Sequence, residues 1–406
     1  MADREIQVRG SSVVAGLLEP VTTGEFLGSY WLQRHVWCRG AADRFSSLLS
    51  WPILNRILEH HWREPHRFRL ARQGHDLDAG AYTDEGPFGR KIRAGAVTEQ
   101  LRCGATLSFD AIDEVHEPLT RLAESFEAFF RGGTKINIYA GWRARHGLDL
   151  HRDNQEIFIA QLDGRKRWLL YGFTADGLDR TGLCEHSLPP AGAEFDEILT
   201  PGDLLYIPRG CYHLAVPMNE PTLHLTIGVK NPRESDLLQW LVDRYRANGA
   251  GERDLPCLAP SADRIRYSDQ FRTMLLDALD ADLVAQYLAE TGSNCKPRPV
   301  FNLPWSATAE VLPPGRSYLL RLTAPASLHI KADASAVLLQ HSGRAYRFPR
   351  GVTAILDRLA DGTSKPIGDL LDTLAERFDE ETVRLLVALL VKHDLIVLTP
   401  DDNGRA

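Results

Sequence analysis

Hydrophobic and polar residues change their spacing along the chain, and the spacing predicts an N-terminal region of mixed helices and short strands. Apolar residues recur at helical intervals in 26–37 and in 45–62, where Ser46 or Ser47 lies near the expected cap. Residues 68–74 alternate in the manner of a β-strand. The segment 105–132 predicts a strand followed by a helix, whose apolar stripe consists of Leu119, Leu122, Phe126 and Phe129.

The region from Lys135 to Lys230 consists of short alternating stretches separated by turn residues, which predicts a β-barrel or β-sandwich. Asp163-Gly164 suits a type I′ turn, so the stretches on either side of it are expected to form a hairpin. The same reasoning applies to the breaks farther along, at Pro201-Gly202 and Pro208-Arg209-Gly210. The stretches expected to form strands are 135–141, 157–162, 165–172, parts of 198–217, and 222–230.

Helical spacing returns after Asn231-Pro232, in 236–247 and 271–292, and the proline-rich stretch 293–305 has the composition of a linker. The last part of the chain predicts three helices among short strands, which is typical of a winged-helix module; the helices are 351–360, 367–378 and 380–393. We therefore expect three regions, which are 1–232, 233–305 and 306–406.

The composition is that of a folded protein, with 44% hydrophobic and 25% charged residues among 406. A net charge of -7 lacks the basic balance of nucleic-acid-binding proteins, so a nucleic-acid partner is not expected. No apolar run reaches the roughly 18 residues of a membrane span, and no signal-peptide core is visible at the N-terminus. Six scattered cysteines without a C-x-x-C pair predict free thiols in a reducing compartment, which favours a cytoplasmic location.

Three residues have the types and spacing of a metal site. His151 and Asp153 are two positions apart, so on a strand their side chains point to the same side, and His213 follows a turn in a second predicted strand. Two imidazoles and one carboxylate form the facial triad of non-haem Fe(II) oxygenases, which leaves metal positions open for a co-substrate and O2. Histidines on strands are more often core residues, and His224 is an alternative ligand.

Lys166 shares one face of its predicted strand with Trp168, and this face is expected to point into the barrel. Because a buried ammonium without a partner is unfavourable or loses its proton, an anion is expected beside it. A dicarboxylate that chelates the metal at one end would place its other carboxylate there. Alternatively, Lys166 lies at the surface with its stem on Trp168. Other polar side chains that could hydrogen-bond such a co-substrate are Asn137, Tyr139 and Thr226.

These motifs resemble those of the JmjC-type Fe(II)/2-oxoglutarate oxygenases, specifically the ribosomal oxygenase branch. The resemblance rests on KINIYAGWRARHGLDLHRDNQEIFIAQLDGRKRWLLY, PGDLLYIPRGCYHLAV and LHLTIGV, and it covers most of residues 20–232. It implies a mainly β, double-stranded β-helix (cupin) core with flanking helices, a helical dimerisation segment and a C-terminal winged-helix domain. The family's iron ligands fall on His151, Asp153 and His213, its anchor for the distal carboxylate of 2-oxoglutarate on Lys166, and its strand asparagine on Asn137.

The segment GWRARHGLDL, residues 141–150, departs from the family pattern. A run rich in proline, serine and glycine usually precedes the iron motif in the family, and an aromatic residue is common where this chain has Arg152. Because the segment should border the substrate channel, Arg143, Arg145 and Arg152 are candidates for substrate contact. A solvated basic loop is the other interpretation.

The resemblance implies a homodimeric enzyme that hydroxylates a side-chain carbon of a protein or peptide, using Fe(II), 2-oxoglutarate and O2. One substrate class is a ribosomal protein, modified at arginine or histidine. A second is the precursor of a peptide natural product, with the winged-helix module gripping its leader. A non-catalytic, cupin-like metal-binding regulator is the third reading, and Lys166 argues against it because a purely structural barrel needs no inward lysine.

Overall fold

The structure is a computed structural model, which describes residues 2–5, 11–87, 89–143, 147–173, 192–247, 253–279, 282–291, 301–308, 312–313, 315–323, 329–332, 336–341 and 344–400. Most of the predicted linker 293–305, up to residue 300, lies outside this part of the chain. Among the described helices, none is both long and apolar enough to cross a membrane.

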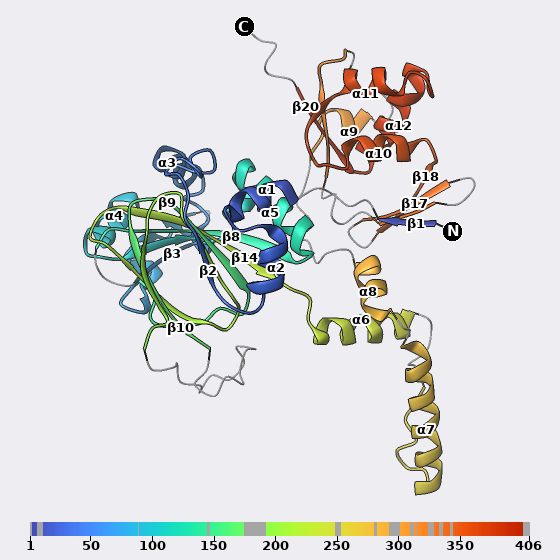
Figure 1. The fold of residues 1–406 in the computed structure, drawn as a ribbon, viewed down its shortest axis with the longest axis horizontal. Helices are drawn as coiled ribbons and strands as arrows, with labels where there is room; N and C mark the ends of the chain where they lie inside the picture. The colour runs from blue at the N-terminus through green and yellow to red at the C-terminus, as the bar shows by residue number, and fades with distance from the viewer. Residues whose placement is uncertain are drawn as a thin grey trace.

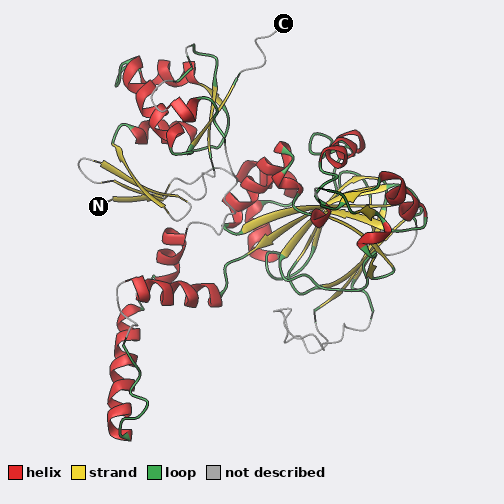
Figure 2. Ribbon diagram, turned by 180° about the vertical axis from the view of Figure 1, so that it is seen from behind, coloured by secondary structure: helices red, strands yellow, loops and turns green. Residues whose placement is uncertain are grey.

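Two antiparallel sheets form the framework of the N-terminal half (Figures 1 and 2). The smaller sheet has the order β11 (Phe195–Leu199), β10 (Lys166–Gly172), β13 (Tyr212–Pro217). Apolar side chains from both sheets meet in one buried cluster, so the sheets pack face to face as predicted for a barrel or sandwich. The larger sheet has the order β2 (Val36–Cys38), β12 (Leu204–Ile207), β9 (Glu156–Asp163), β14 (Thr222–Lys230), β8 (Gly133–Gly141), β7 (Thr106–Phe109), β3 (Phe68–Arg72), β4 (His75–Asp76).

The chain crosses from one sheet to the other between β9 and β14, and this corrects the predicted hairpins. Strand β9 belongs to the larger sheet and β10 to the smaller one, so the Asp163-Gly164 turn joins strands that do not pair with each other. Of the two turn residues only Gly164 has a positive φ, 62°, whereas a type I′ turn needs two. Pro201-Gly202 likewise joins β11 to β12 in the other sheet. Turn residues predict where the chain reverses, but not which strand it then pairs with.

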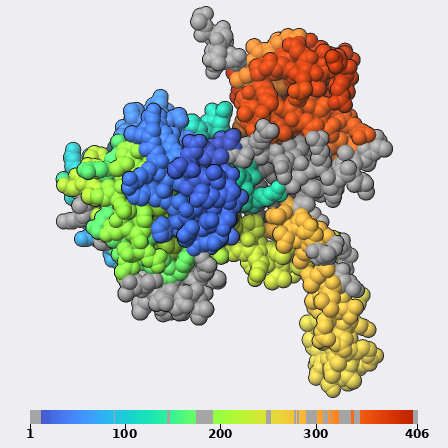
Figure 3. Space-filling model, in the orientation of Figure 1, coloured from blue at the N-terminus to red at the C-terminus, as the bar shows by residue number. Residues whose placement is uncertain are grey.

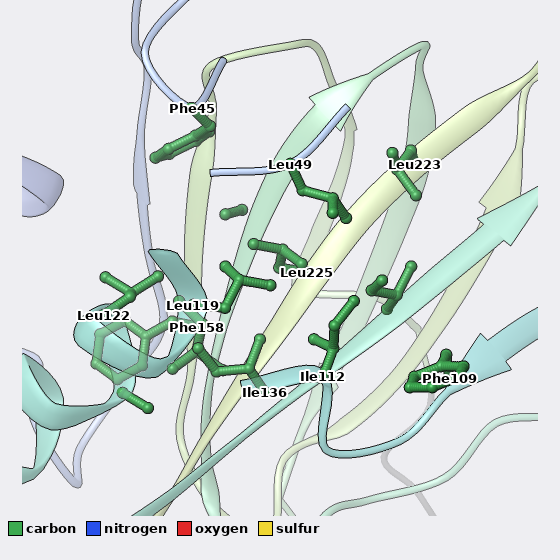
Figure 4. Close-up of a cluster of buried hydrophobic side chains, with 14 of the residues drawn as sticks. Phe45, Leu49, Phe109, Ile112, Leu119, Leu122, Ile136, Phe158, Leu223 and Leu225 are labelled. Atoms are coloured by element: carbon green, nitrogen blue, oxygen red, sulfur yellow. The ribbon is translucent and has the colours of Figure 1, made fainter. Parts of the chain in front are cut away.

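The middle strands of the larger sheet, β9 and β14, are buried on both faces, and their side chains alternate between the two. On one face, helices α1 (Ser11–Leu18), α2 (Thr23–Ser29) and α5 (Glu117–Phe130) cover a core that includes Phe158 and Leu225 (Figures 1 and 4). On strand β8, Ile136 and Ile138 belong to this core. Asn137 and Tyr139, which alternate with these isoleucines along the strand, therefore point toward the smaller sheet. The alternation places polar side chains in the space between the two sheets.

Two predicted helices have different limits in the structure. The helix expected over 26–37 ends at Ser29, and the later part of that stretch forms the edge strand β2, which pairs with β12. The helix expected over 45–62 is the shorter α3 (Trp51–His60), because Pro52 favours the first turn of a helix; Ser50, and neither predicted serine, occupies the N-cap. The remaining elements of this half are η1 (Pro65–Arg67), η2 (Ala79–Ala81), β5 (Thr83–Asp84), β6 (Lys91–Ile92), α4 (Ala94–Arg102) and η3 (Ile112–Glu114).

After β14 the chain forms a helical segment and then a second compact unit with its own core (Figure 3). The stretch 271–292, expected as one helix, contains the end of one helix and the whole of the next; the helices of this segment are α6 (Glu234–Ala247), α7 (Ser261–Ala278) and α8 (Leu283–Thr291). The compact unit contains the helices α9 (Trp305–Thr308), α10 (Val352–Leu359), α11 (Ile367–Leu374) and α12 (Glu380–Lys392).

Two small sheets accompany the helices of the compact unit. One has the order β19 (Lys365–Pro366), β15 (Leu319–Leu322), β20 (Ile396–Thr399). The other has the order β1 (Ala2–Glu5), β16 (His329–Ala332), β17 (Ala336–His341), β18 (Arg344–Pro349), so the N-terminal strand pairs with the C-terminal part of the chain. The sequence pattern did not predict this pairing.

The turn at Gly164 yields a stability prediction. A side chain at Gly164 would carry the strain of a positive φ, and its Cβ would lie 1.9 Å from the carbonyl oxygen of Pro221. Gly192 also has a positive φ, but a Cβ there would meet no described atom within 4 Å. We expect G192A to lower the free energy of unfolding by the strain alone, about 1–2 kcal/mol, and G164A by clearly more. Denaturant unfolding of both variants measures the difference, and equal losses would contradict the turn geometry.

Candidate metal centre

Main-chain hydrogen bonds hold together the two segments that carry the predicted metal ligands. The amide of His151 donates to the carbonyl of His213 at 3.2 Å, and the amide of His213 donates to the carbonyl of His151 at 2.8 Å. His213 lies on β13, as expected. His151 lies in the connection between β8 and β9, where it forms an isolated antiparallel bridge with His213. The predicted strand for the His-x-Asp pair is therefore wrong. The chain bends after the bridge, where the amide of Gly210 donates to the carbonyl of Asp153 at 3.0 Å.

The three side chains converge as the sequence predicted. One ligand atom from each of His151, Asp153 and His213 lies within 4.8 Å of the other two. The Nε2 atom of His213 is 3.7 Å from Oδ2 of Asp153, and the two imidazole rings are 4.4 Å apart between centroids. His213 is buried, while His151 and Asp153 are half-buried. The group is near enough to hold one metal ion.

Each histidine is fixed by a hydrogen bond on the ring nitrogen that faces away from the group. Nδ1 of His151 is 2.7 Å from the carbonyl oxygen of Asp149, and Nδ1 of His213 is 3.0 Å from that of Cys211. Because a carbonyl can only accept, Nδ1 carries the proton in both rings and Nε2 keeps its lone pair. This orientation by a carbonyl is the usual support for a metal-binding histidine, so the residues fit a metal ion.

The protonation state of His213 also suits a metal ligand. Burial lowers the pKa of His213 to about 4, and the neighbouring His151 acts in the same direction, whereas Asp153 opposes the shift. The imidazole is therefore neutral near pH 7, which is the form that donates electrons to a metal.

Lys166 lies inside the space between the two sheets. Lys166, Trp168 and Leu170 are buried on β10 while Arg167 is exposed, so the predicted inward face of the strand is confirmed. In the described part of the chain, no hydrogen-bonded partner or carboxylate contacts the Lys166 ammonium, whose Nζ lies 5.7 Å from the centroid of the Trp168 ring. Burial alone lowers the pKa of Lys166 to about 7. The ammonium is thus placed where an anion would stabilise it.

Further polar side chains share a pocket with Lys166 and the three candidate ligands, and they include Tyr139, His224 and Thr226. His224 is buried, and its ring stacks on Tyr139 with 5.2 Å between centroids. Among the described residues, neither the Nδ1 of His224 nor the buried indole Nε1 of Trp168 has a hydrogen-bond partner. Burial lowers the pKa of His224 well below its ordinary value, with Lys166 adding to the shift. His224, considered from the sequence only as a metal ligand, therefore lies with the lysine.

Tyr139 and Asn137 occupy the expected face of β8 but have different surroundings. Burial, followed by the charge of Asp153, raises the pKa of Tyr139 to about 12, so its hydroxyl stays protonated and can donate. The amide oxygen of Asn137 accepts a hydrogen bond from the amide of Ala111 at 3.0 Å. That contact ties β8 to the turn after β7, and the predicted contact of Asn137 with a co-substrate stays a prediction.

Two of the three arginines near the His-x-Asp pair lie in the described part of the chain, and they contact different groups. Arg145 lies outside the described residues. Arg143 is exposed, its Nε donates to the carbonyl of Arg102 at 3.4 Å, and it lines a separate groove of about 900 Å³ between α3 and α4. The guanidinium of Arg152 lies 5.1 Å from the centroid of the Tyr212 ring, beside the strand that carries the third ligand. Their predicted contact with a substrate stays a prediction.

Comparison with known proteins gives a family match in this part of the chain. A family model described as JmjC domain matches residues 113–237, which contain the three candidate ligands and Lys166. The chain is 29% identical over 233 residues to the bifunctional lysine-specific demethylase and histidyl-hydroxylase NO66 of Drosophila grimshawi, covering 54% of this chain and 31% of that protein. It is 35% identical over 133 residues to ribosomal oxygenase 2 of Rattus norvegicus, covering 30% and 27%. The chain thus spans about a third or less of these two relatives.

Solved structures extend the likeness to nearly the whole chain. The ribosomal oxygenase YcfD of Escherichia coli superposes with a TM-score of 0.60 at 19% identity, covering 93% of this chain and 98% of that chain. A further structure of YcfD is a complex with cobalt and 2-oxoglutarate. The shared fold confirms the predicted cupin core with its flanking helices. Residues 113–237 therefore match the JmjC domain family, within a chain whose fold is similar to that of the ribosomal oxygenase YcfD.

Proposed function

We propose that the protein is an Fe(II)- and 2-oxoglutarate-dependent oxygenase that hydroxylates a side-chain carbon of a protein. The observation that carries this proposal is that one pocket contains both the His-Asp-His group and a buried lysine without an anion. On β10, Leu170 is opposite His213 and Lys166 lies four residues away. Four residues of strand span about 13 Å. This distance leaves room for a metal ion, a five-carbon dicarboxylate and the lysine side chain, one after another along the pocket.

Each residue of the pocket has a defined task in this proposal. His151, Asp153 and His213 would hold the iron. Lys166 binds the distal carboxylate of 2-oxoglutarate through a charge-assisted hydrogen bond, which also restores the ordinary pKa of the ammonium. Trp168 and His224 line the same pocket, and their nitrogen atoms, which have no partner in the described part of the chain, offer further hydrogen bonds. Bound together, the iron and 2-oxoglutarate supply the activation of O2 that hydroxylation of a carbon requires.

The choice among the functions expected from the sequence rests on two observations. The names of the two relatives, histidyl-hydroxylase and ribosomal oxygenase, support a protein side chain as the substrate, in particular one of a ribosomal protein. A non-catalytic metal-binding regulator has no use for Lys166, whose burial is unfavourable until an anion binds. Hydroxylation of a peptide precursor uses the same pocket, and the identity of the substrate distinguishes it from the first function.

We also propose that the protein acts as a homodimer in the cytoplasm. Helices α6 to α8 expose large apolar side chains, as expected of an interface, and α7 projects from the rest of the chain (Figures 1 and 3). Helices α10 to α12 beside a three-stranded sheet support a winged-helix-like module. The net charge of the chain, -7, does not favour nucleic acid as a partner of this module. The free thiols of Cys38, Cys103, Cys211 and Cys257 suit a reducing compartment.

The activity itself gives the first test. With Fe(II), ascorbate and O2, we expect the purified protein to convert 2-oxoglutarate to succinate, faster when peptides from ribosomal proteins are present. The variant H213A should lose this turnover by a factor on the order of 100 or more, because the metal loses a ligand. H75A, which removes an exposed histidine, is the control. No succinate above the buffer background, or equal rates in H213A and the parent, would reject the proposal.

Lys166 gives a second test, in which binding and stability move in opposite directions. Its pKa is about 7 in the folded protein against an ordinary value of 10.5, so between these pH values the unfolded chain binds a proton that the folded chain lacks. The stability of the metal-free protein should therefore rise with pH across this window. We expect K166M to abolish this rise. Near pH 6 the free energy of unfolding of K166M should exceed that of the parent by on the order of 3 kcal/mol, because the variant buries no charge at this position.

The same K166M variant should lose binding of 2-oxoglutarate, since the distal carboxylate has no cation left to pair with. Calorimetric titration of the metal-loaded protein with 2-oxoglutarate and denaturant unfolding at pH 6 and pH 9 give the two readouts. K135M is the control, because it removes a lysine that is 42% exposed and already paired, with its Nζ 3.8 Å from Oδ2 of Asp110. Unchanged affinity for 2-oxoglutarate in K166M would remove Lys166 from the co-substrate site.

The dimer is tested on the helical segment. Ile265 and Leu276 on α7 are 63% and 61% exposed, so charged residues at these positions should not disturb the fold but should prevent burial against a second copy. We expect the double variant I265E/L276E to be monomeric by light scattering at concentrations where the parent is a dimer. L385E, at a residue of α12 that is 56% exposed, is the control. A monomeric parent, or a dimeric double variant, would contradict this interface.

A further inference from the structure

A buried carboxylate lies next to the metal-binding segment without belonging to the group of ligands. Glu156 is the first residue of β9, three positions after Asp153, and is only 2% exposed. Its Oε2 accepts a hydrogen bond from the hydroxyl of Tyr206 at 2.6 Å and a second from the amide of Arg209 at 3.1 Å. A carboxylate at such a depth needs bound donors, because burial without them is strongly unfavourable. Glu156 thus joins two segments that are distant in the sequence.

One partner of Glu156 is fixed in the aromatic core. The Tyr206 ring is fully buried and lies 5.0 Å from the Phe26 ring and 4.9 Å from the Phe158 ring. Its hydroxyl donates to Glu156 and at the same time accepts a hydrogen bond from the amide of Leu32 at 2.9 Å. With both bonds made and the ring enclosed, the hydroxyl cannot turn away. The carboxylate is therefore held by a rigid part of the fold.

The other partner of Glu156 belongs to the turn that leads into β13. Arg209 lies four residues before His213, and the next amide in the turn, that of Gly210, donates to the carbonyl of Asp153. Two adjacent amides of the turn are thus bound by the segment 153–156, one by the side chain of Glu156 and one by the main-chain carbonyl of Asp153. Together with the bridge between His151 and His213, these bonds join the segment 151–156 to the segment 209–213, and these two segments carry the three candidate ligands.

We propose that Glu156 is a positioning residue that sets the separation of the metal ligands by tying the His213 turn to the aromatic core through Tyr206. This inference rests on the proposed metal site, which it deepens. Without the carboxylate, the amide of Arg209 and the hydroxyl of Tyr206 both lose their hydrogen-bond acceptor. The turn then keeps the Gly210 bond, the bridge to His151 and the pairing of β13 with β10, but it loses its tie to the aromatic core, so His213 approaches the metal in a wider range of positions.

The test is metal binding rather than turnover, with Co(II) as the probe. We expect E156A to bind Co(II) about 10- to 100-fold more weakly than the parent, which is the usual effect of losing support behind a metal ligand. The visible ligand-field bands of the Co(II) complex should also change, because they report the geometry of the ligands. E156Q should restore most of the affinity, since its amide oxygen can accept both hydrogen bonds.

A matched control separates positioning from a general loss of stability. Glu127 on α5 is also a buried carboxylate, 1% exposed, and its Oε1 accepts the amide of Thr134 at 3.2 Å, away from the ligand-bearing segments. E127A should therefore keep the Co(II) affinity and spectrum of the parent. If E156A does not fold, Y206F removes the same hydrogen-bond donor with the ring intact, and a loss of a few-fold in affinity is expected.

The outcomes distinguish this inference from the proposed function. Weaker Co(II) binding and altered bands in E156A or Y206F, with E127A unchanged, support the positioning role. Parent-like binding in E156A, or in Y206F where E156A does not fold, overturns it, and so does an equal loss in E127A. A parent protein that binds no Co(II) overturns the metal site itself and the positioning role with it.

Discussion

The main-chain bridge between His151 and His213 is the contact on which the candidate site depends. It joins the segment between β8 and β9 to a strand of the other sheet, so the ligands meet only if both sheets are folded and packed. The carbonyl groups of Asp149 and Cys211, near in sequence to the two histidines, then orient the rings. Because the orienting groups are main-chain atoms, the direction of each imidazole follows from the fold itself rather than from further side chains.

The same packing creates the electrostatic character of the pocket. Lys166, Trp168 and His224 each bring a nitrogen into an enclosed space, and the charge of Lys166 lies opposite no carboxylate in the described part of the chain. An arrangement of this kind lowers stability and is retained where a ligand uses it. In the proposed function, a dianionic co-substrate would satisfy both ends at once, since one carboxylate would join the metal and the other the lysine. The pocket is thus complementary to a bound state rather than to the empty protein.

Much of this arrangement could be predicted from the sequence, because period-two alternation directly encodes which side chains face inward. It identified the inward face with Lys166 and Trp168, and the residue types of the three candidate ligands indicated a metal. It failed at Asp163-Gly164, because turn chemistry acts locally while strand pairing depends on distant residues. It also missed the tasks of Glu156 and His224, since the donors around a buried polar group come from segments that only the fold brings together.

In the proposed site, one dicarboxylate spans the pocket, with the metal ion at one end and Lys166 at the other. Anaerobic titration of the Fe(II)-loaded protein with 2-oxoglutarate tests this arrangement, because a keto acid chelated to Fe(II) produces a visible charge-transfer band. We expect the band to appear and to saturate at one equivalent of 2-oxoglutarate per chain. If no band appears although Fe(II) is bound, the metal and the lysine do not form one co-substrate site.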